Sequence, residues 1–545
     1  MTIETILEAA KRAYQKCLRS SRLPKVQISG RKNIYALLVS LILCGGIYSF
    51  WKDSGKPLNS LSNSTTEQTD PPEIIFNELS DNRMSRVIKD AMVHSWKAYR
   101  MYAWGMDVTN PIKLSGSEWM GAALTMIDSL DTLWIMGLTK EFDDARGWIA
   151  ANLTFDKNND HINLFETTIR VLGGLLSAYH LSKDDLFLQK AKELGSLLLV
   201  AFHSSSSFPL PDLNFAHRTA HHSPQYRDAC LSEMAVQLEF NQFSLLTNDV
   251  RFAVRSGKIL RRLHSLPTYH GLLPNFIDRE GGPNWDSRIG IGAHGDSYYE
   301  YLLKVWIQTG KKINALRDDY RKAIKGIQDH LVGYSKPNNL MFIGELNDGD
   351  FTPLMDHLVC FLPGTLILGY RNGMPRSHMK MAEQLLETCF QLYNQTETGL
   401  SPEIARYSTD VRSKKDFTPE EIDTHNILRP EVIESLFYAY QQTKESKYRE
   451  WGAAIFNAFM KYSRLTYAGF AGIKNVSDVN SARIDQMDSF WLSETLKYFF
   501  LLFDEAAASK YSIDKWLFNT EAHLFPISSN TENPLIKVYF QLYAL

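Results

Sequence analysis

The chain has 545 residues, of which 44% are hydrophobic, and its formal net charge at pH 7 is -2. A chain of this length and composition can bury a large core, and length alone would favour two to four domains. Because the net charge is close to zero, the composition argues against a nucleic-acid partner.

The N-terminal residues predict a membrane anchor. Residues 1–33 carry eight Lys and Arg against two Glu, and residues 34–51 (IYALLVSLILCGGIYSFW) form an uncharged apolar run of about bilayer length. Since the run is long and lacks a small-residue cleavage pattern, we expect a transmembrane signal anchor rather than a cleaved signal peptide. The positive-inside rule then predicts a cytosolic basic tail at 1–33 and a lumenal position for everything after the anchor.

The residues after the anchor agree with a lumenal body. Residues 52–79 lack periodicity and include a stretch rich in Ser, Asn, Thr and Pro, which is typical of a flexible stem. In an oxidising lumen, Cys230, Cys360 and Cys389 can form at most one internal disulfide, and their spacing does not choose the pair. Candidate N-glycosylation sequons lie at Asn63, Asn152, Asn394 and Asn475.

From about residue 80 the sequence predicts helix after helix, beginning with an amphipathic helix over 84–104. Seven unusually apolar helices are then expected to begin near Met120, Leu164, Leu231, Asp296, Leu354, Pro430 and Asp488. Most precede a more charged helix, and such charged helices are expected at 183–202, 250–264, 316–332, 378–393 and 445–462. This alternation predicts a single all-α ring over residues 80–545, with apolar helices inside and charged helices outside.

The expected inner helices carry carboxylates, most of them in the first turns. One acid at a helix N-terminus is commonly only a cap, because the helix dipole favours anions there. In a ring of parallel inner helices, however, the same ends meet at one mouth. The acids would then share a pocket with Arg170, Arg429 and aromatic side chains, an arrangement that suits a sugar. They are Glu166, Glu233, Glu239, Asp296, Glu300, Glu431, Glu434 and Glu494.

Three other sequence patterns were considered as alternative functional sites, and none favours one. The histidines in FAHRTAHHS (His217, His221 and His222) resemble metal ligands, but neighbouring Ser and Pro indicate a loop. The Gly173-Gly174 pair inside a helix favours close helix packing over phosphate binding. A Ser-His-Asp hydrolase is disfavoured because the sequence contains no nucleophile elbow.

Near the C-terminus, residues 516–527 (WLFNTEAHLFPI) predict a short strand or hairpin that dips into the interior. Apolar residues flank the polar centre Asn519, Thr520, Glu521 and His523, and the segment is too short for a helix with a face to bury. Burying these polar groups among aromatic residues is unfavourable unless partners or a metal satisfy them. The segment is therefore a candidate site.

At these residues the chain resembles glycoside hydrolase family 47, the class I α-mannosidases, and most closely their endoplasmic-reticulum processing members. The resemblance covers about residues 94–527. It implies an (αα)7 barrel plugged at one end by a C-terminal β-hairpin, and removal of α-1,2-linked mannose from high-mannose N-glycans with inversion of configuration. The matching motifs are HSWKAYRMYAWG, IDSLDTLWIMGL, FETTIRVLGGLLSAY, GDSYYEYLLK, HLVCFLPG, LRPEVIESLFYAY, SETLKYFFLLF and FNTEAHLFPI.

The resemblance also implies roles for individual residues. Glu166 matches the general acid, Glu431 the base that activates water, and Asp296 a third essential carboxylate. Whether Asp296 or Glu431 is the base stays open. The residues that match positions at or near the substrate are Arg170, Glu239, His294, Glu403, Arg429, Glu434, Phe490, Glu494 and Glu521.

The family's cofactor is implied at the hairpin. Thr520 matches the residue whose hydroxyl and carbonyl oxygens hold Ca²⁺, a hard cation that takes six to eight oxygens. Glu434, Glu494 and Glu521 match acids that hold the water ligands. Cys360 and Cys389 match the disulfide of the processing enzymes, which leaves Cys230 as the odd thiol.

Two rival functions stay open beside a processing enzyme anchored in the membrane of the endoplasmic reticulum or the Golgi. One is a glycan-binding degradation factor of the same superfamily, with weak or no hydrolysis, whose members typically lack this cysteine pair. The other is a non-catalytic membrane-tethered interaction protein. The chain also departs from its relatives at His294, where endoplasmic-reticulum members usually carry Arg, and at Trp491 and Ser493 beside Glu494.

Overall fold

The computed structural model describes residues 81–155, 162–203, 208–223, 228–527 and 533–544. They belong to one compact unit, Asp70–Leu545. The predicted tail, anchor and stem, and the sequon at Asn63, lie outside the described residues. No helix in the described ranges has both the length and the hydrophobicity to cross a membrane.

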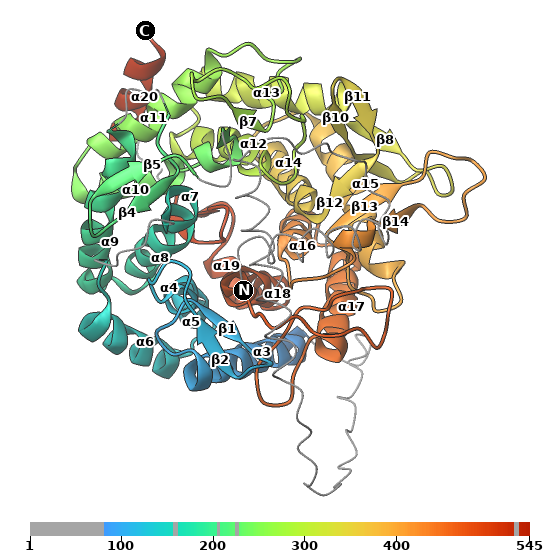
Figure 1. Ribbon diagram of the computed structural model, residues 1–545, viewed down its shortest axis with the longest axis horizontal. Coiled ribbons are helices and arrows are strands. Elements are labelled where there is room, and N and C mark those ends of the chain that lie inside the picture. Colours follow the sequence, from blue (N-terminus) through green and yellow to red (C-terminus); the bar gives the residue numbers. More distant parts are fainter. Residues whose placement is uncertain (1–80, 156–161, 204–207, 224–227, 528–532, 545) are drawn as a thin grey trace, which may run out of the picture. The chain divides into compact units, whose positions relative to one another are not determined.

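The helices follow one another around a ring in chain order, from blue through green and yellow to orange in Figure 1. Seven inner helical segments succeed one another within the described residues. They are α4 (Leu124–Asp128) with α5 (Leu130–Ile135), α7 (Leu164–Glu166) with η2 (Thr167–Leu172) and α8 (Gly173–Ser182), α10 (Gln237–Thr247), α12 (Asp296–Gln308), α14 (Leu362–Arg371), α16 (Glu431–Thr443), and η7 (Trp491–Thr495) with α18 (Leu496–Phe503).

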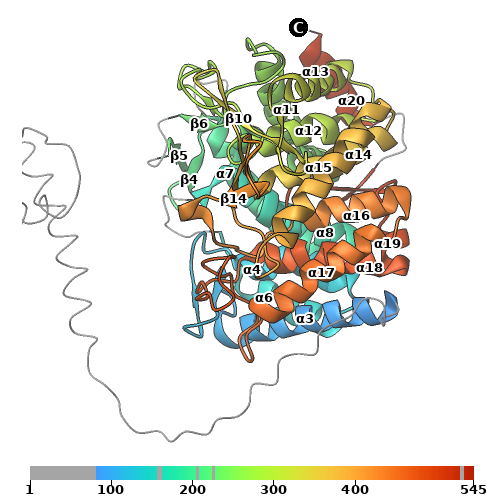
Figure 2. The same ribbon diagram turned by 90° about the vertical axis from the view of Figure 1, so that its right-hand side faces the viewer.

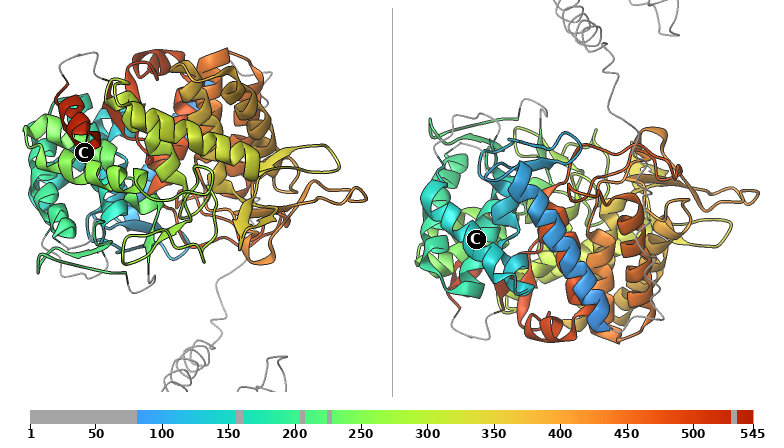
Figure 3. Two further views of the ribbon diagram at one scale, coloured as in Figure 1. Left: turned by 90° about the horizontal axis from the view of Figure 1, so that it is seen from above. Right: turned by 90° about the horizontal axis from the view of Figure 1, so that it is seen from below.

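Each inner segment packs against an outer helix, and α18 packs against both α3 and α5, which closes the ring. Figure 3 shows α3 along the outside of the ring in the view from below. The outer helices are α3 (Asp81–Tyr102), α6 (Thr139–Asn152), α9 (Asp185–Leu198), α11 (Arg251–His264), α13 (Asn314–His330), α15 (Arg376–Asn394) and α17 (Lys447–Tyr462).

The inner and outer helices differ in burial as their amino-acid compositions predict. Every residue of α18 (LKYFFLLF) is buried, and so is every residue of α12 after its first. The outer helix α11 buries only one face, through residues such as Phe252, Ile259 and Leu263, and exposes its arginines and lysine to varying degrees. The expected alternation of apolar inner and charged outer helices is therefore confirmed.

Short strands and helices connect these pairs, and Figure 2 shows many of the strands gathered at one end of the ring. All strand pairs are antiparallel. The strands are β1 (Val108–Asn110), β2 (Ser115–Ser117), β3 (Ile162–Asn163), β4 (Asp212–Asn214), β5 (Thr219–His221), β6 (Ala229–Cys230), β7 (Phe276–Ile277), β8 (Val332–Tyr334), β9 (Met341–Ile343), β10 (Glu345–Asn347), β11 (Asp350–Thr352), β12 (Leu354–Asp356), β13 (Ile404–Tyr407), β14 (Phe417–Pro419), β15 (Trp516–Phe518) and β16 (Leu524–Pro526). The remaining helices are η3 (Leu199–Phe202), η4 (Ser232–Met234), η5 (His357–Phe361), η6 (Glu421–Asp423), α19 (Glu505–Lys510) and α20 (Pro534–Tyr543).

Three expected helix starts are several residues too early. Helix α4 begins at Leu124 rather than near Met120. Leu354 begins strand β12, which pairs with β13, and helical structure starts only at His357 in η5. Leu231 precedes the short η4, and α10 begins at Gln237. His221 is also the last residue of strand β5 rather than part of an irregular loop.

The predicted hairpin forms from β15 and β16, with Trp516 paired to Pro526 and Phe518 to Leu524. Two glycines in α8 allow the turn of the hairpin and helix α4 to pack closely against this helix. A Cβ atom on Gly173 would lie 2.9 Å from Cδ2 of His523, and one on Gly174 would lie 2.8 Å from the carbonyl oxygen of Ile127. Such contacts are too short for real side chains, which confirms that the glycine pair serves close packing.

The structure gives the pairing of the three cysteines in the described residues and the exposure of the sequon asparagines there. Cys360 and Cys389 form a disulfide, as the resemblance implied, and Cys230 is a buried free thiol. Asn152 and Asn394 are exposed at the ends of α6 and α15, and Asn475 is half-buried.

Candidate active site

A cavity of about 560 Å³ lies where the first turns of several inner helices meet the turn of the hairpin. Polar and apolar side chains share its wall, as in many small-molecule sites. Of the residues expected in the site, those that line the cavity are Glu166, Arg170, His294, Asp296, Arg429, Glu431, Glu434, Phe490, Glu494, Thr520 and Glu521.

Glu166 occupies one wall, at the junction of α7 and η2. The side chain of Asn163 caps α7 by accepting a hydrogen bond from the backbone N–H of Glu166 at 3.0 Å. Arg170, one turn later, donates from Nε to Glu166 Oε2 at 2.7 Å and from Nη1 to Glu521 Oε1 at 2.6 Å. One guanidinium therefore links the helix that carries Glu166 to the turn of the hairpin.

Glu431 is the first residue of α16, and a hydrogen-bonded chain fixes its carboxylate. His357 Nδ1 lies 2.8 Å from Glu431 Oε2, and His357 Nε2 lies 2.8 Å from the hydroxyl of Tyr393. Burial alone would raise the pKa of Glu431, but His357 and the nearby guanidinium of Arg429 outweigh it and hold that pKa below its usual range. Glu431 is therefore ionised at neutral pH.

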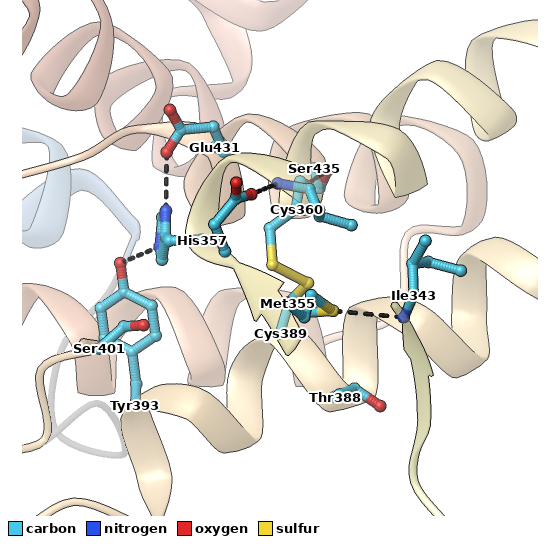
Figure 4. Close-up of a disulfide and its surroundings, with 12 residues drawn as sticks. Ile343, Met355, His357, Cys360, Thr388, Cys389, Tyr393, Ser401, Glu431 and Ser435 are labelled. Carbon is cyan, nitrogen blue, oxygen red and sulfur yellow. Dashed lines mark hydrogen bonds and ion pairs between the residues drawn. A yellow bond between two sulfur atoms is a disulfide. The ribbon is translucent and has the colours of Figure 1, made fainter. Parts of the chain in front are cut away.

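The disulfide braces this chain of hydrogen bonds, as Figure 4 shows. Cys360 follows His357 by three residues in η5, and Cys389 precedes Tyr393 by four residues in α15. The bridge therefore joins η5 and α15, the two elements that supply His357 and Tyr393 to this chain of hydrogen bonds.

Asp296 is the first residue of α12, and its pKa is shifted in the opposite direction to that of Glu431. Burial raises its pKa to about 8, with further contributions from Asp356 and Glu300, although the backbone N–H of Ser297 donates to Asp296 Oδ1 at 2.6 Å. Because no cation pairs with it in the described structure, Asp296 is largely protonated at neutral pH.

Carboxylates crowd around Thr520 at the turn of the hairpin. Burial raises the pKa of Glu434 to about 8, against the opposing effect of Lys304. It also raises the pKa values of Glu494 and Glu521 well above their usual range, with added repulsion between neighbouring acids. The hydroxyl of Thr520 lies 3.2 Å from that of Ser297. This part of the cavity is rich in oxygen ligands, and its carboxylates outnumber the nearby cations Lys304 and Arg170.

Three expected site residues occupy supporting or peripheral positions. Glu239 is fully buried behind the cavity lining, where it accepts hydrogen bonds from Tyr301 and Asn519, both at 2.7 Å. Glu403 also lies outside the lining and accepts a hydrogen bond from Arg429 Nε at 2.6 Å. His294 lines the cavity, and burial followed by the charge of Arg288 lowers its pKa, so it is neutral at pH 7.

Two residues that shape the site, Trp119 and His357, were not predicted from the sequence. Glu233 and Glu300 line the cavity with the other acids, as the helix pattern predicted, and burial raises the pKa of Glu233 to about 7. Trp119 also lines the cavity, and His357 holds Glu431. No sequence spacing signals the last contact, because 74 residues separate its partners.

Comparison with known proteins agrees with this geometry. The glycosyl hydrolase family 47 model matches residues 91–527. The chain is 47% identical to an endoplasmic reticulum mannosyl-oligosaccharide 1,2-alpha-mannosidase of Homo sapiens over 82% of this chain and 64% of that protein. It is 40% identical to a mannosyl-oligosaccharide 1,2-alpha-mannosidase of Arabidopsis thaliana over 88% of this chain and 84% of the relative.

A solved structure shares the fold. The alpha-1,2-mannosidase from Trichoderma reesei superimposes with a TM-score of 0.75 at 27% identity, covering 82% of this chain and 99% of its own. A family match over most of the chain, together with relatives of this identity, leads to one conclusion: the chain belongs to glycosyl hydrolase family 47.

Proposed function

We propose that this protein is an inverting, Ca²⁺-dependent exo-glycosidase that removes terminal α-1,2-linked mannose from high-mannose N-glycans of glycoproteins. The observation that carries the proposal is a buried, carboxylate-lined cavity in which Glu431, the candidate base, is ionised and which Glu166, the candidate acid, lines from a different helix. Glycoside hydrolysis needs carboxyl groups in both states at the same pH. The names of the relatives supply the sugar and the linkage.

In the proposed mechanism, Glu431 is the base that takes a proton from the attacking water. Its lowered pKa supports this role, because the base must be ionised at the working pH. Asp296 suits the role less well, since its pKa of about 8 would leave it protonated at neutral pH. This difference favours Glu431 in the choice that the resemblance left open.

Glu166 would donate a proton to the oxygen of the departing sugar. Its carboxylate lines the same cavity as that of Glu431 but comes from a different helix. In an inverting pair, a water lies between the acid and the base. Arg170 orients it through the 2.7 Å hydrogen bond. Asp296 would then bind substrate or water as the third carboxyl group.

The residues around Thr520 fit a calcium ion. The donors here are oxygens, which Ca²⁺ prefers, and the pKa values of Glu434 and Glu494 are raised by burial and by neighbouring acids, effects that Lys304 and Arg170 do not outweigh. In the described ranges, no three His, Cys, Asp or Glu side chains converge as a metal's ligand set. By the resemblance, Thr520 would be the direct protein ligand and the acids would hold water ligands. The bound ion would supply positive charge and coordinate sugar hydroxyls.

We further propose that the protein resides in the membrane of the endoplasmic reticulum or the Golgi, as a single-pass type II protein with a lumenal catalytic body. The name of the human relative supports the endoplasmic reticulum. The uncharged run at 34–51 and its basic flank support the anchor.

The test is turnover by residues 80–545 of a nine-mannose glycan, followed by mass spectrometry. We expect loss of the α-1,2-linked mannoses, little turnover after exhaustive chelation, and recovery on adding Ca²⁺. Glu431→Gln should abolish turnover but keep glycan binding. A parent protein that binds the glycan without cleaving it would instead support the glycan-binding degradation factor.

A further inference from the structure

The side chain of Asn519, at the turn of the hairpin, uses its full hydrogen-bonding capacity. Its Oδ1 accepts from the backbone N–H groups of Glu521 at 2.9 Å and His523 at 2.7 Å. Its Nδ2 donates to the carbonyl oxygen of Ile169 at 3.0 Å and to Glu239 Oε1 at 2.7 Å. A primary amide offers two acceptor positions and two donors, so none is left over. This one buried side chain therefore both shapes the turn and joins it to the inner helices.

Glu239, the acid that receives the last of these bonds, lies in α10 behind the cavity lining. Its Oε1 accepts from Asn519 and also from the hydroxyl of Tyr301, each at 2.7 Å. Its Oε2 is buried and has no hydrogen-bond partner among the described residues. One oxygen therefore makes both bonds, and the hairpin makes no use of the other.

Tyr301 gives Glu239 a second connection to the turn. It is fully buried in α12, and its hydroxyl lies 3.4 Å from the backbone nitrogen of Thr520. The turn is thus held from α10, from α12 and, through the carbonyl of Ile169, from η2. A turn fixed from three sides is pre-organised, so less conformational freedom is lost when it binds an ion.

We propose that Glu239 is a positioning residue that, through Asn519 and Tyr301, holds Thr520 in place for the calcium ion. The proposal rests on the proposed function, which assigns Thr520 to the ion. Glu239 acts here as a hydrogen-bond acceptor and not as a charge. Without the acceptor, two buried donors would lose their partner, and the turn would relax to satisfy them.

The test compares two neutral substitutions of similar size in protein stripped of calcium. Glu239→Gln keeps an oxygen that can accept both bonds, whereas Glu239→Leu does not, and both remove the same charge. Calorimetry with Ca²⁺ should show about tenfold weaker binding by Glu239→Leu than by Glu239→Gln. Before calcium is added, the amide hydrogen of His523 should also exchange faster with solvent in Glu239→Leu.

A second pair of variants tests the proposal even if Glu239→Leu fails to fold. Tyr301→Phe removes only the hydroxyl and should weaken Ca²⁺ binding by about threefold. Tyr299→Phe is the matched control, because Tyr299 is also buried in α12 but its hydroxyl bonds to the backbone of Leu273, at 3.1 Å from the nitrogen. It should bind Ca²⁺ like the parent.

Each other result counts against the proposal. Equal Ca²⁺ affinities in Glu239→Gln and folded Glu239→Leu would show that hydrogen-bond acceptance by this side chain does not position the turn. Equal affinities in Tyr301→Phe and Tyr299→Phe would overturn the connection through α12. Either result would leave the proposed function intact, whereas a parent protein that binds no Ca²⁺ would overturn both.

Discussion

At the scale of single residues, the state of Glu431 depends on one neighbour. His357 contributes both a hydrogen bond and positive charge to the effects that lower the pKa of Glu431 against burial. A carboxylate base is active when ionised, so activity is lost as pH falls through its pKa. His357→Ala should therefore raise the pKa of Glu431 and move the acid limb of kcat/KM to higher pH.

The pH profile also distinguishes the two candidate bases. If Glu431 is the base, the acid limb of kcat/KM in the parent should lie well below neutral pH, because the pKa of Glu431 is lowered. If Asp296 were the base, kcat/KM would rise through about pH 8, the pKa of Asp296. His357→Gln, which retains a hydrogen-bond donor, should give a smaller shift than His357→Ala. An unchanged acid limb in a folded His357→Ala protein would contradict the role assigned to His357.

At the scale of elements, the hairpin is tied to the inner helices by buried charges. His523 lies between Asp131, with Nδ1 2.9 Å from Oδ2, and Asp128, with Nε2 3.0 Å from Oδ1. Lys497 of α18 lies 2.9 Å from Asp131 and donates to the carbonyl of Ala522 at 2.7 Å. All four charged side chains are fully buried.

Removing the imidazole should destabilise the fold in a pH-dependent way. Burial alone would lower the pKa of His523, but Asp131 and Asp128 outweigh it and raise that pKa. The stabilisation is therefore complete below the unfolded pKa of about 6.5 and is lost as pH rises through the higher folded pKa. His523→Gln should cost about 3 to 5 kcal/mol in the free energy of unfolding at pH 6, as measured by denaturant titration.

His264→Gln is the control for this measurement, because His264 pairs with Asp319 at 2.6 Å but its side chain is 32% exposed. That pair should contribute about 1 kcal/mol or less. A loss in His523→Gln that matched the control, or that grew as the pH was raised above 6, would contradict the buried ion-pair account.

The disulfide acts between elements as well. It closes a loop with a sequence separation of 29 residues, for which the chain-entropy model gives about 3 to 4 kcal/mol of stabilisation. Replacing both cysteines by serine should lower the free energy of unfolding by about that amount. It should also reduce kcat, because η5 carries His357. Peptide mapping without reduction should recover the Cys360–Cys389 peptide, and a bridge to Cys230 would contradict the pairing.

At the scale of the whole molecule, periodicity in the sequence predicted the ring of helices but not every position at which a helix starts. The residues around Leu354 (LMDHLVCFLPG) are apolar throughout, so a three-residue strand and the start of a helix look alike in the sequence. The strand forms because β13, some 50 residues later, supplies its partner. Long-range pairing of this kind leaves no mark on local periodicity.

In the candidate site, too, some residues could be predicted from the local sequence and others could not. Carboxylates near helix starts, such as Asp296 and Glu431, could be found because parallel inner helices bring those ends together. The groups that hold Glu431 could not be found in this way, since His357 contacts it from η5 and Tyr393 contacts His357 from α15. For the same reason, the helix pattern alone could not show that Glu239 and Glu403 lie behind the cavity lining.

The central claim is that two carboxyl groups on different helices of one cavity cleave the mannosidic bond by direct attack of water. The most direct measurement is time-resolved proton NMR of the first mannose released from a high-mannose glycan, before the free sugar mutarotates. The account predicts β-mannose as the first-formed anomer, because a single displacement inverts the configuration. Initial release of α-mannose, or an intact glycan in the presence of Ca²⁺, would contradict it.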